Sequence, residues 1–127
     1  MASEGLHESA DTLDAVTIDH HRAVTSLCEE LEAIDWYDQR VRATDDASLA
    51  DILAHNRDEE KEHAAMTLEW IRRRDPALDR HLRTYLFTTE PITELETEAM
   101  DGVADTAGAQ VATGSGSLGI GSLRRNG

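Results

Sequence analysis

Glycine is scarce along most of this 127-residue sequence. It does not occur between Leu6 and Met100, whereas seven of the eight glycines lie from Gly102 onward. Glycine loosens helices and makes linkers flexible, so this distribution divides the chain sharply. We expect a structured helical segment over residues 1–97 and a flexible linker over residues 98–116, with the composition of the run "DGVADTAGAQVATGSGS".

Cysteine and long apolar runs are also nearly absent. The single cysteine, Cys28, excludes an internal disulfide framework, and its neighbours indicate a structural thiol rather than a reactive one. No window holds the ~20 apolar residues that a membrane-spanning helix needs. The start of the chain has neither the basic nor the apolar region of a signal peptide. We therefore expect a cytosolic protein with no membrane partner.

Positive charge is in short supply. The chain has 26 Asp and Glu against 12 Lys and Arg, a formal net charge of −14, and residues 99–127 are balanced. Such a surface argues against a nucleic-acid partner, because phosphate backbones bind basic proteins. It favours cations, whose local concentration an acidic surface raises. The length allows one small domain.

The spacing of the apolar residues predicts two long helices. The first is expected roughly from His7 to Arg42, and the second after a turn in which Asp45 or Asp46 is the N-cap. The second helix ends before Pro76. Apolar stripes recur at three- and four-residue steps, through Leu13, His20, Val24, Leu27, Leu31 and Ile34 in the first helix and Leu49, Ile52, Leu53, Asn56, Glu60, His63, Thr67, Trp70 and Ile71 in the second.

Two shorter helices are expected beyond this pair, over residues 77–87 and 92–100. The fold class is therefore all-α, built on an antiparallel helical hairpin. Two amphipathic helices cannot cover each other's apolar faces completely. We expect the hairpin to dimerise and so to complete a four-helix bundle.

Two polar side chains interrupt the stripe of the second helix. At ~100° per residue, Glu60 lies about 20° and His63 about 40° from Leu49, the centre of the stripe. Glu30 of the first helix flanks the corresponding stripe, about 60° from Leu27. A buried carboxylate needs a cation, a proton or a hydrogen-bonded partner. The pattern thus predicts that Glu60 and His63 point at the core.

These three residues have the chemistry of a metal site. A di-iron carboxylate bundle takes a Glu from each of two helices and Glu-x-x-His from each of two more. Glu30 with Glu60-x-x-His63 supplies half of that set, and a two-fold dimer would supply the rest. The alternative is structural: a buried Glu60–His63 or Glu60–Arg pair, or a helix turned so that these groups face water.

Two further polar groups lie away from the stripes. Each is most simply a solvated surface. If dimers pack further, the paired carboxylates of the group on the first helix could pass cations inward. The group on the second helix could bind adventitious cations. The groups are Glu29, Glu32 and Trp36 on the first helix, and His55, Glu59 and Glu62 on the second.

Over nearly all of residues 4–97 the sequence resembles the encapsulated ferritins of bacteria. The segments that carry the resemblance are "LHESADTL", "HRAVTSLCEELEAIDWYDQR", "HNRDEEKEHAAMTLEWIRRR" and "LRTYLFTTEPITELE". It implies a ferroxidase whose protomer is half of a ferritin bundle, with a di-iron site at the dimer interface and dimers assembled into a decameric ring. The metal would be iron, with zinc or calcium as adventitious occupants.

The resemblance also implies roles for individual residues. Glu30, Glu60 and His63 would be the iron ligands, each contributed twice, and Tyr37 the nearby tyrosine that orients ligands or tunes the metal. The remaining two groups would be a site where metal enters between dimers (Glu29, Glu32 and Trp36) and an outer cation site (His55, Glu59 and Glu62).

The end of the chain resembles a different element. The segment "SLGIGSLRR", Ser117–Arg125, is similar to the short C-terminal targeting peptides of encapsulin cargo proteins. Leu118, Ile120 and Leu123 are apolar side chains on a glycine-jointed strand, suited to small pockets on a partner. The resemblance therefore implies that the chain is held inside an encapsulin nanocompartment in the bacterial cytoplasm.

Two other functions remain open on the residues alone. A rubrerythrin-like di-iron peroxidase would want an added electron-transfer centre, for which one cysteine provides no rubredoxin-like domain. A non-enzymatic helical adaptor would bind only the shell and hold no metal.

Overall fold

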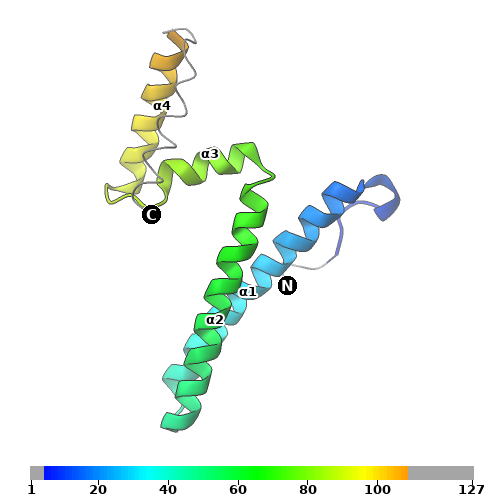
Figure 1. Ribbon diagram of the computed structural model, residues 1–127, viewed down its shortest axis with the longest axis vertical. Helices are drawn as coiled ribbons and strands as arrows, with labels where there is room; N and C mark the ends of the chain where they lie inside the picture. The colour runs from blue at the N-terminus through cyan, green and yellow to red at the C-terminus, as the bar shows by residue number, and fades with distance from the viewer. Residues whose placement is uncertain (1–4, 109–127) are drawn as a thin grey trace. The chain divides into compact units, whose positions relative to one another are not determined.

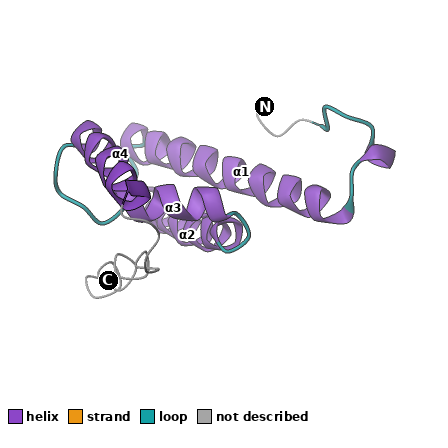
Figure 2. Cartoon of the chain, turned by 90° about the horizontal axis from the view of Figure 1, so that it is seen from above, coloured by secondary structure: helices purple, strands orange, loops and turns teal. Residues whose placement is uncertain are grey.

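The structure is a computed structural model that describes residues 5–108, with side chains to residue 102. This part of the chain contains helices and no strand (Figure 2). It confirms the predicted all-α fold. The elements are a short 3₁₀ helix η1 (Ala10–Thr12) and the helices α1 (Ala15–Ala43), α2 (Ala47–Arg72), α3 (Pro76–Tyr85) and α4 (Ile92–Gly108) (Figure 1).

The chain divides into two compact units, Met1–Arg74 and Asp75–Gly127. In the first unit, α1 and α2 form the antiparallel hairpin. The two helices pack against each other near the turn that joins them and diverge toward their other ends (Figure 1). The paired halves of the hairpin therefore bring the middle of α1 against the middle of α2.

The first helix begins later than its periodicity predicts. The predicted start at His7 is wrong, because α1 starts at Ala15 behind an N-cap at Asp14, whose carboxylate accepts a 2.8 Å hydrogen bond from the backbone N–H of Thr17. That hydrogen bond lowers the pKa of Asp14. Ser9 caps the separate 3₁₀ turn. Short polar side chains that bond to nearby backbone groups compete with a continuous helix.

A comparable cap starts the second helix. Of the two aspartates expected in the turn, Asp46 is the N-cap: its Oδ1 accepts a 2.9 Å hydrogen bond from the backbone N–H of Leu49. The hydroxyl of Thr44 in turn accepts from the backbone N–H of Asp46. Side-chain oxygens of Thr44, after α1, and of Asp46, before α2, therefore stabilise the turn between the two helices.

Replacing this cap should measurably weaken the protein. Asp46→Ala leaves a helix N–H without its partner and is expected to lower the free energy of unfolding by about 1 kcal/mol. Asp45→Ala is the matched control, since Asp45 is exposed and is not the cap residue; it should change the same quantity by less than ~0.5 kcal/mol. Denaturant unfolding of both variants measures the difference, and equal effects would contradict the assignment.

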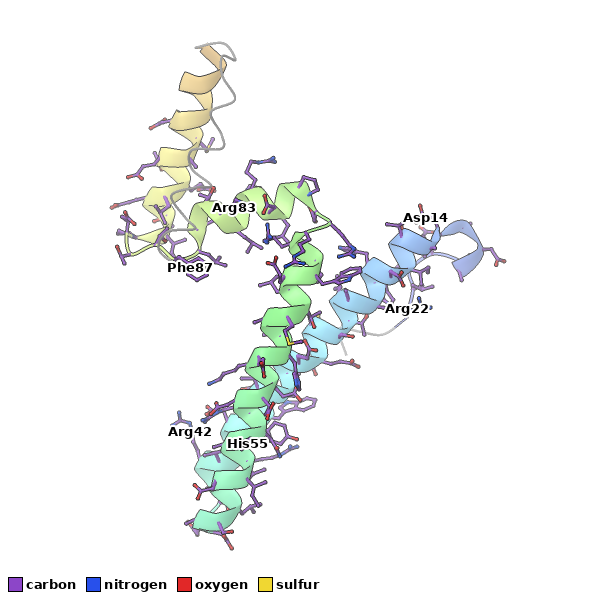
Figure 3. All side chains as sticks on the ribbon, in the orientation of Figure 1. Asp14, Arg22, Arg42, His55, Arg83 and Phe87 are labelled. Carbon is purple, nitrogen blue, oxygen red and sulfur yellow. The ribbon has the colours of Figure 1, made fainter. Side chains whose placement is uncertain are left out.

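An ion-pair network holds the hairpin near its turn. Arg57 of α2 donates to Asp38 of α1 across the helix pair at 2.9 Å, and Arg42 donates to the other Asp38 oxygen at 3.1 Å. The hydrogen bonds from Arg42 and Arg57 lower the pKa of Asp38. Arg42 and His55 both lie toward this end of the hairpin, whereas Asp14 and Arg22 lie toward the other (Figure 3).

The apolar interior of the described residues is very small. Ala64 and Ile71 of α2 and Leu95 of α4 are the buried apolar side chains, and no side chain described is less than 2% exposed. Large apolar side chains of the hairpin are instead left open, including Leu31 (54% exposed), Ile52 (57%) and Met66 (63%). This supports the expectation that the hairpin buries its faces against a second chain. No helix within residues 5–108 is both long and apolar enough to cross a membrane.

The second unit contains α3 and α4. Asp75 caps α3 and Pro76 is its first residue, one residue before the predicted start, and the helix ends at Tyr85 rather than at the predicted residue 87. The last helix runs to Gly108, beyond the predicted end at Met100 and into the stretch assigned to the linker. Alanines with high helix propensity offset Gly102 there. The remaining linker residues and the segment Ser117–Arg125 lie outside the described part of the chain.

Candidate metal centre

Glu60 and His63 stand one helical turn apart on α2. The Nδ1 atom of His63 lies 3.6 Å from Oε2 of Glu60, which is close for an ion pair but too long for a hydrogen bond. The Glu60 side chain is 26% exposed and the His63 side chain 47%. In the single chain Glu60 is thus half-buried, while His63 is more open than its place on the apolar stripe predicts. Both remain free to bind a common ion.

Glu30 lies on α1, facing α2. Its Oε1 is 3.2 Å from the hydroxyl of Thr67. Its Oε2 is buried and has no hydrogen-bond partner, the only such side-chain atom found among the described residues. Glu30 and Thr67 also line a groove of about 540 Å³ between the helices, together with Ala23, Ser26, Met66, Trp70, Asp19 and Arg22. The carboxylate therefore combines one held oxygen with one that lacks a partner.

The contacts between α1 and α2 set the register of these groups. Glu30 of α1 is level with Thr67 of α2. Thr67 comes seven residues after Glu60, which corresponds to about 10 Å along the axis of α2. One chain therefore places Glu60 beside His63 and leaves Glu30 further along the hairpin. Within residues 5–108 no group of three or more His, Cys, Asp or Glu side chains is arranged to hold a metal ion. A metal site with this ligand set needs a second chain.

Tyr37 lies two turns after Glu30 on α1. It is half-buried, and the guanidinium of Arg40 stands 5.5 Å from the centre of its ring. Its neighbour Asp38 contacts Arg57 of α2, so Tyr37 is nearly level with Glu60. The phenol is thus near the Glu60 end of the predicted site rather than the Glu30 end.

The two outer groups remain predictions, and the structure gives their surroundings. On α1, Glu29 is exposed, Glu32 is half-buried and Trp36 is 46% exposed. On α2, His55 Nε2 lies 3.1 Å from Glu59 Oε1, with both side chains largely in solvent. Glu62, exposed on α2, completes the second group. An exposed cluster of carboxylates and an imidazole can bind a cation but is equally suited to water.

A charged cluster at the end of α2 was not anticipated. Glu69 accepts hydrogen bonds of 2.7 Å from both Arg72 and Arg73, which lower its pKa to about 2. The guanidinium of Arg74 stacks on Trp70 at 3.8 Å from the ring centre. The spacing of Glu69 from Arg72 and Arg73, three and four residues, was the available signal. Arg72 and Arg73 therefore stabilise the end of α2, whereas Arg74 contacts Trp70, which lines the same groove as Glu30.

Comparison with known proteins places the chain among ferritin-like relatives. Residues 5–89 match the EncFtn-like family. The chain is 56% identical to the encapsulated ferritin-like protein of Rhodospirillum rubrum over 98% of its own length and 91% of that protein. It is 54% identical to the ferritin-like protein of Thermotoga maritima, over 80% of this chain and 90% of that one. These matches confirm the family that the sequence motifs indicated.

Two further matches extend the comparison. The chain is 37% identical to the encapsulin nanocompartment cargo protein EncC of Myxococcus xanthus, over 76% of this chain and 77% of that protein. The crystal structure of protein ne0167 from Nitrosomonas europaea has a TM-score of 0.69 and 62% identity, and it covers 70% of this chain and 98% of its own. The helical architecture described above is therefore shared with an experimentally determined relative.

Proposed function

This chain belongs to the EncFtn-like family, and we propose that it is a ferroxidase carried as cargo by an encapsulin nanocompartment. In this proposal two protomers form one site for two Fe²⁺ ions, which are the substrate. Each ion gives one electron to O₂, which takes up two protons from water to become hydrogen peroxide, and the Fe³⁺ product leaves for mineral storage within the shell. The protein would act in the shell lumen, in the bacterial cytoplasm.

One observation carries the proposal: the buried Oε2 of Glu30 has no hydrogen-bond partner among the residues that the structure describes. A buried carboxylate oxygen is unfavourable unless a cation, a proton or a donor satisfies it. A cation is the partner that also accounts for Glu60 and His63 beside one another on the facing helix. The half-site in one chain becomes a complete ligand set when a two-fold axis supplies the second copy.

The donor atoms suit iron in both oxidation states. Carboxylate oxygens from Glu30 and Glu60 favour the harder Fe³⁺ product, while the imidazole of His63 retains Fe²⁺ before oxidation. Tyr37, near the level of Glu60, would orient these ligands or tune the metal from just outside them.

The outer groups would serve the supply of iron. We assign the acidic and aromatic group on α1 to the entrance for metal between dimers, because its open carboxylates can exchange hydrated cations quickly. The group on α2 would be an outer cation site. Their residues are Glu29, Glu32 and Trp36, and His55, Glu59 and Glu62, respectively.

Assembly is part of the proposal. The open apolar faces of the hairpin support a dimer, and the family resemblance supports a decameric ring of such dimers. An open ring has no closed cavity for mineral, so storage would fall to the shell. The segment Ser117–Arg125 would bind the shell wall, and several copies on one ring would add their weak affinities.

Stoichiometric oxidation of iron tests the proposed function. Anaerobic titration with Fe²⁺ is expected to show a tight phase that saturates at one ion per chain, since each dimer holds two at the ligand set, followed by weaker binding at the outer groups. Admitting O₂ should then oxidise that iron rapidly. An oxygen electrode measures the consumption of O₂, and native mass measurement with and without Fe²⁺ gives the number of bound ions. The iron-dependent O₂ consumption separates catalysis from simple metal binding.

Each alternative predicts a different result. A helical adaptor would bind no iron, and Fe²⁺ would consume O₂ no faster with the protein than in buffer alone. A rubrerythrin-like peroxidase would oxidise the bound iron quickly with hydrogen peroxide but slowly with O₂. Either outcome would contradict the ferroxidase assignment.

A further inference from the structure

Thr67 connects the two halves of the candidate ligand set within one chain. Its hydroxyl oxygen lies 3.2 Å from Oε1 of Glu30 on α1 and 3.0 Å from the backbone carbonyl oxygen of His63 on its own helix. We propose that Thr67 is a positioning residue for the iron site: it holds Glu30 by one oxygen so that the other faces the substrate ion. The inference rests on the proposed ferroxidase function.

The helix backbone keeps the Thr67 hydroxyl in place. A threonine in a helix has few side-chain rotamers, and the one seen here places its oxygen against the carbonyl four residues earlier. That carbonyl belongs to His63, so the hydroxyl is fixed to the same helical turn that carries the imidazole. The position of Glu30 is thereby tied to the position of His63.

The hydroxyl has one proton for two acceptors. The carboxylate of Glu30 is the stronger acceptor, since hydrogen bonds to ionised oxygens are about twice as strong as neutral ones. The contact of 3.2 Å is long for such a bond. We therefore expect the proton to be shared between the two acceptors in the free chain, so that the hydroxyl already orients Oε1 of Glu30 before an ion arrives.

The two oxygens of Glu30 are consequently unequal. Oε1 has a donor, whereas Oε2 is buried and has no donor within the described part of the chain. A carboxylate held at one oxygen has less freedom to rotate about its last bond. The free oxygen then keeps a constant direction, and less order must be imposed when Fe²⁺ binds. Without the hydroxyl, Glu30 would still be present but would have to be ordered by the ion itself.

This role predicts a change in binding rather than in chemistry. A group that orders a ligand before the ion arrives contributes equally to the bound substrate and to the transition state. Its loss raises KM and leaves kcat nearly unchanged. A residue needed only for folding would instead lower the amount of active protein and its melting temperature.

The test replaces the hydroxyl while keeping the shape of the side chain. Thr67→Val should weaken anaerobic Fe²⁺ binding by about 10–100-fold, as is typical for partners of metal ligands, and raise KM by the same factor with kcat within about twofold. Thr67→Ser, which retains the hydroxyl, should restore both values. Binding of Co²⁺, read from its visible absorption, gives the affinity independently of any oxidation.

Thr84→Val is the matched control. Its hydroxyl also donates to the backbone carbonyl four residues earlier, that of Arg80, at 3.1 Å, but Thr84 lies on α3 and not on the helices that carry the candidate ligands. This variant should bind Fe²⁺ as the unaltered chain does, with a change in melting temperature similar to that of Thr67→Val. If Thr67→Val does not fold, Thr67→Ala compared with Thr67→Ser gives the same comparison in residues tolerated by helices.

The results separate the inference from the function it rests on. Unchanged Fe²⁺ affinity in Thr67→Val, or a loss that Thr67→Ser fails to restore, would overturn the role of Thr67 while the ferroxidase assignment stands. Normal Fe²⁺ oxidation by Glu30→Ala would overturn the proposed site itself. Weak binding in Thr67→Val with recovery in Thr67→Ser and a normal Thr84→Val supports the inference.

Discussion

Glu60→Ala is expected to abolish rapid, iron-dependent oxygen consumption. The substitution removes a half-buried carboxylate next to His63, and in a two-fold dimer it removes that ligand twice. Since loss of a residue that merely supports a metal ligand costs about 10–100-fold, loss of the ligand itself should exceed that factor. Initial rates with an oxygen electrode, at equal concentrations of assembled protein, measure the effect. Glu30→Ala and His63→Ala should share it.

Asp51→Ala is the appropriate control for this experiment. Asp51 is exposed on the same helix, and its replacement removes the same negative charge without touching the candidate ligands. We expect its oxidation rate to equal that of the unaltered chain. Normal oxidation by Glu60→Ala would refute the site assignment, and an equal loss in Asp51→Ala would indicate that overall charge, rather than coordination, governs the rate.

Removal of Ser117–Gly127 should prevent the chain from being retained by an encapsulin shell. The segment contains Leu118, Ile120 and Leu123, the apolar side chains suited to shell pockets. When the truncated chain and a shell protein are expressed together, the chain should be lost from purified shells. Its oxidation of Fe²⁺ in solution should be unaffected, since the candidate ligands lie on α1 and α2. Gel analysis of the shells and oxygen consumption give the two readouts.

A shorter truncation provides the control. Deletion of Asn126 and Gly127 alone leaves Ser117–Arg125 intact and shortens the same end of the chain. This variant should be loaded into shells as the full chain is. If the longer deletion leaves loading unchanged, the targeting role of Ser117–Arg125 is wrong.

Periodicity predicted the helices well and their ends less well. The apolar stripes indicated the α1–α2 hairpin, and the aspartates before Leu49 indicated its cap. The start of α1 was misplaced because Ser9 and Asp14 offer the backbone local hydrogen bonds that outweigh a continued helix. The sequence does not predict the extension of α4 past Met100, because glycine is typical of a linker there, whereas the alanines near Gly102 favour a continued helix.

The candidate site was predictable in composition but not in geometry. The sequence alone predicted that Glu60 and His63 lie on an apolar stripe with the spacing Glu-x-x-His. The unpartnered oxygen of Glu30 and its contact with Thr67 were not. Both depend on the register between α1 and α2, and side chains 37 residues apart in the chain are brought together only by the packing of the hairpin. The only sequence signal for the role of Thr67 was its position four residues after His63, on the same helix face.

The very small interior of the hairpin has a consequence for the life of a newly made chain. Until it meets a partner, such a chain exposes Leu31, Ile52 and Met66, and uncovered apolar helix faces are what chaperones and proteases recognise. Lone chains should therefore be degraded faster than assembled ones. The cellular amount of the protein would then be limited by the rate at which two chains associate. Proteases would remove the single chains, whose half-sites cannot form an iron centre.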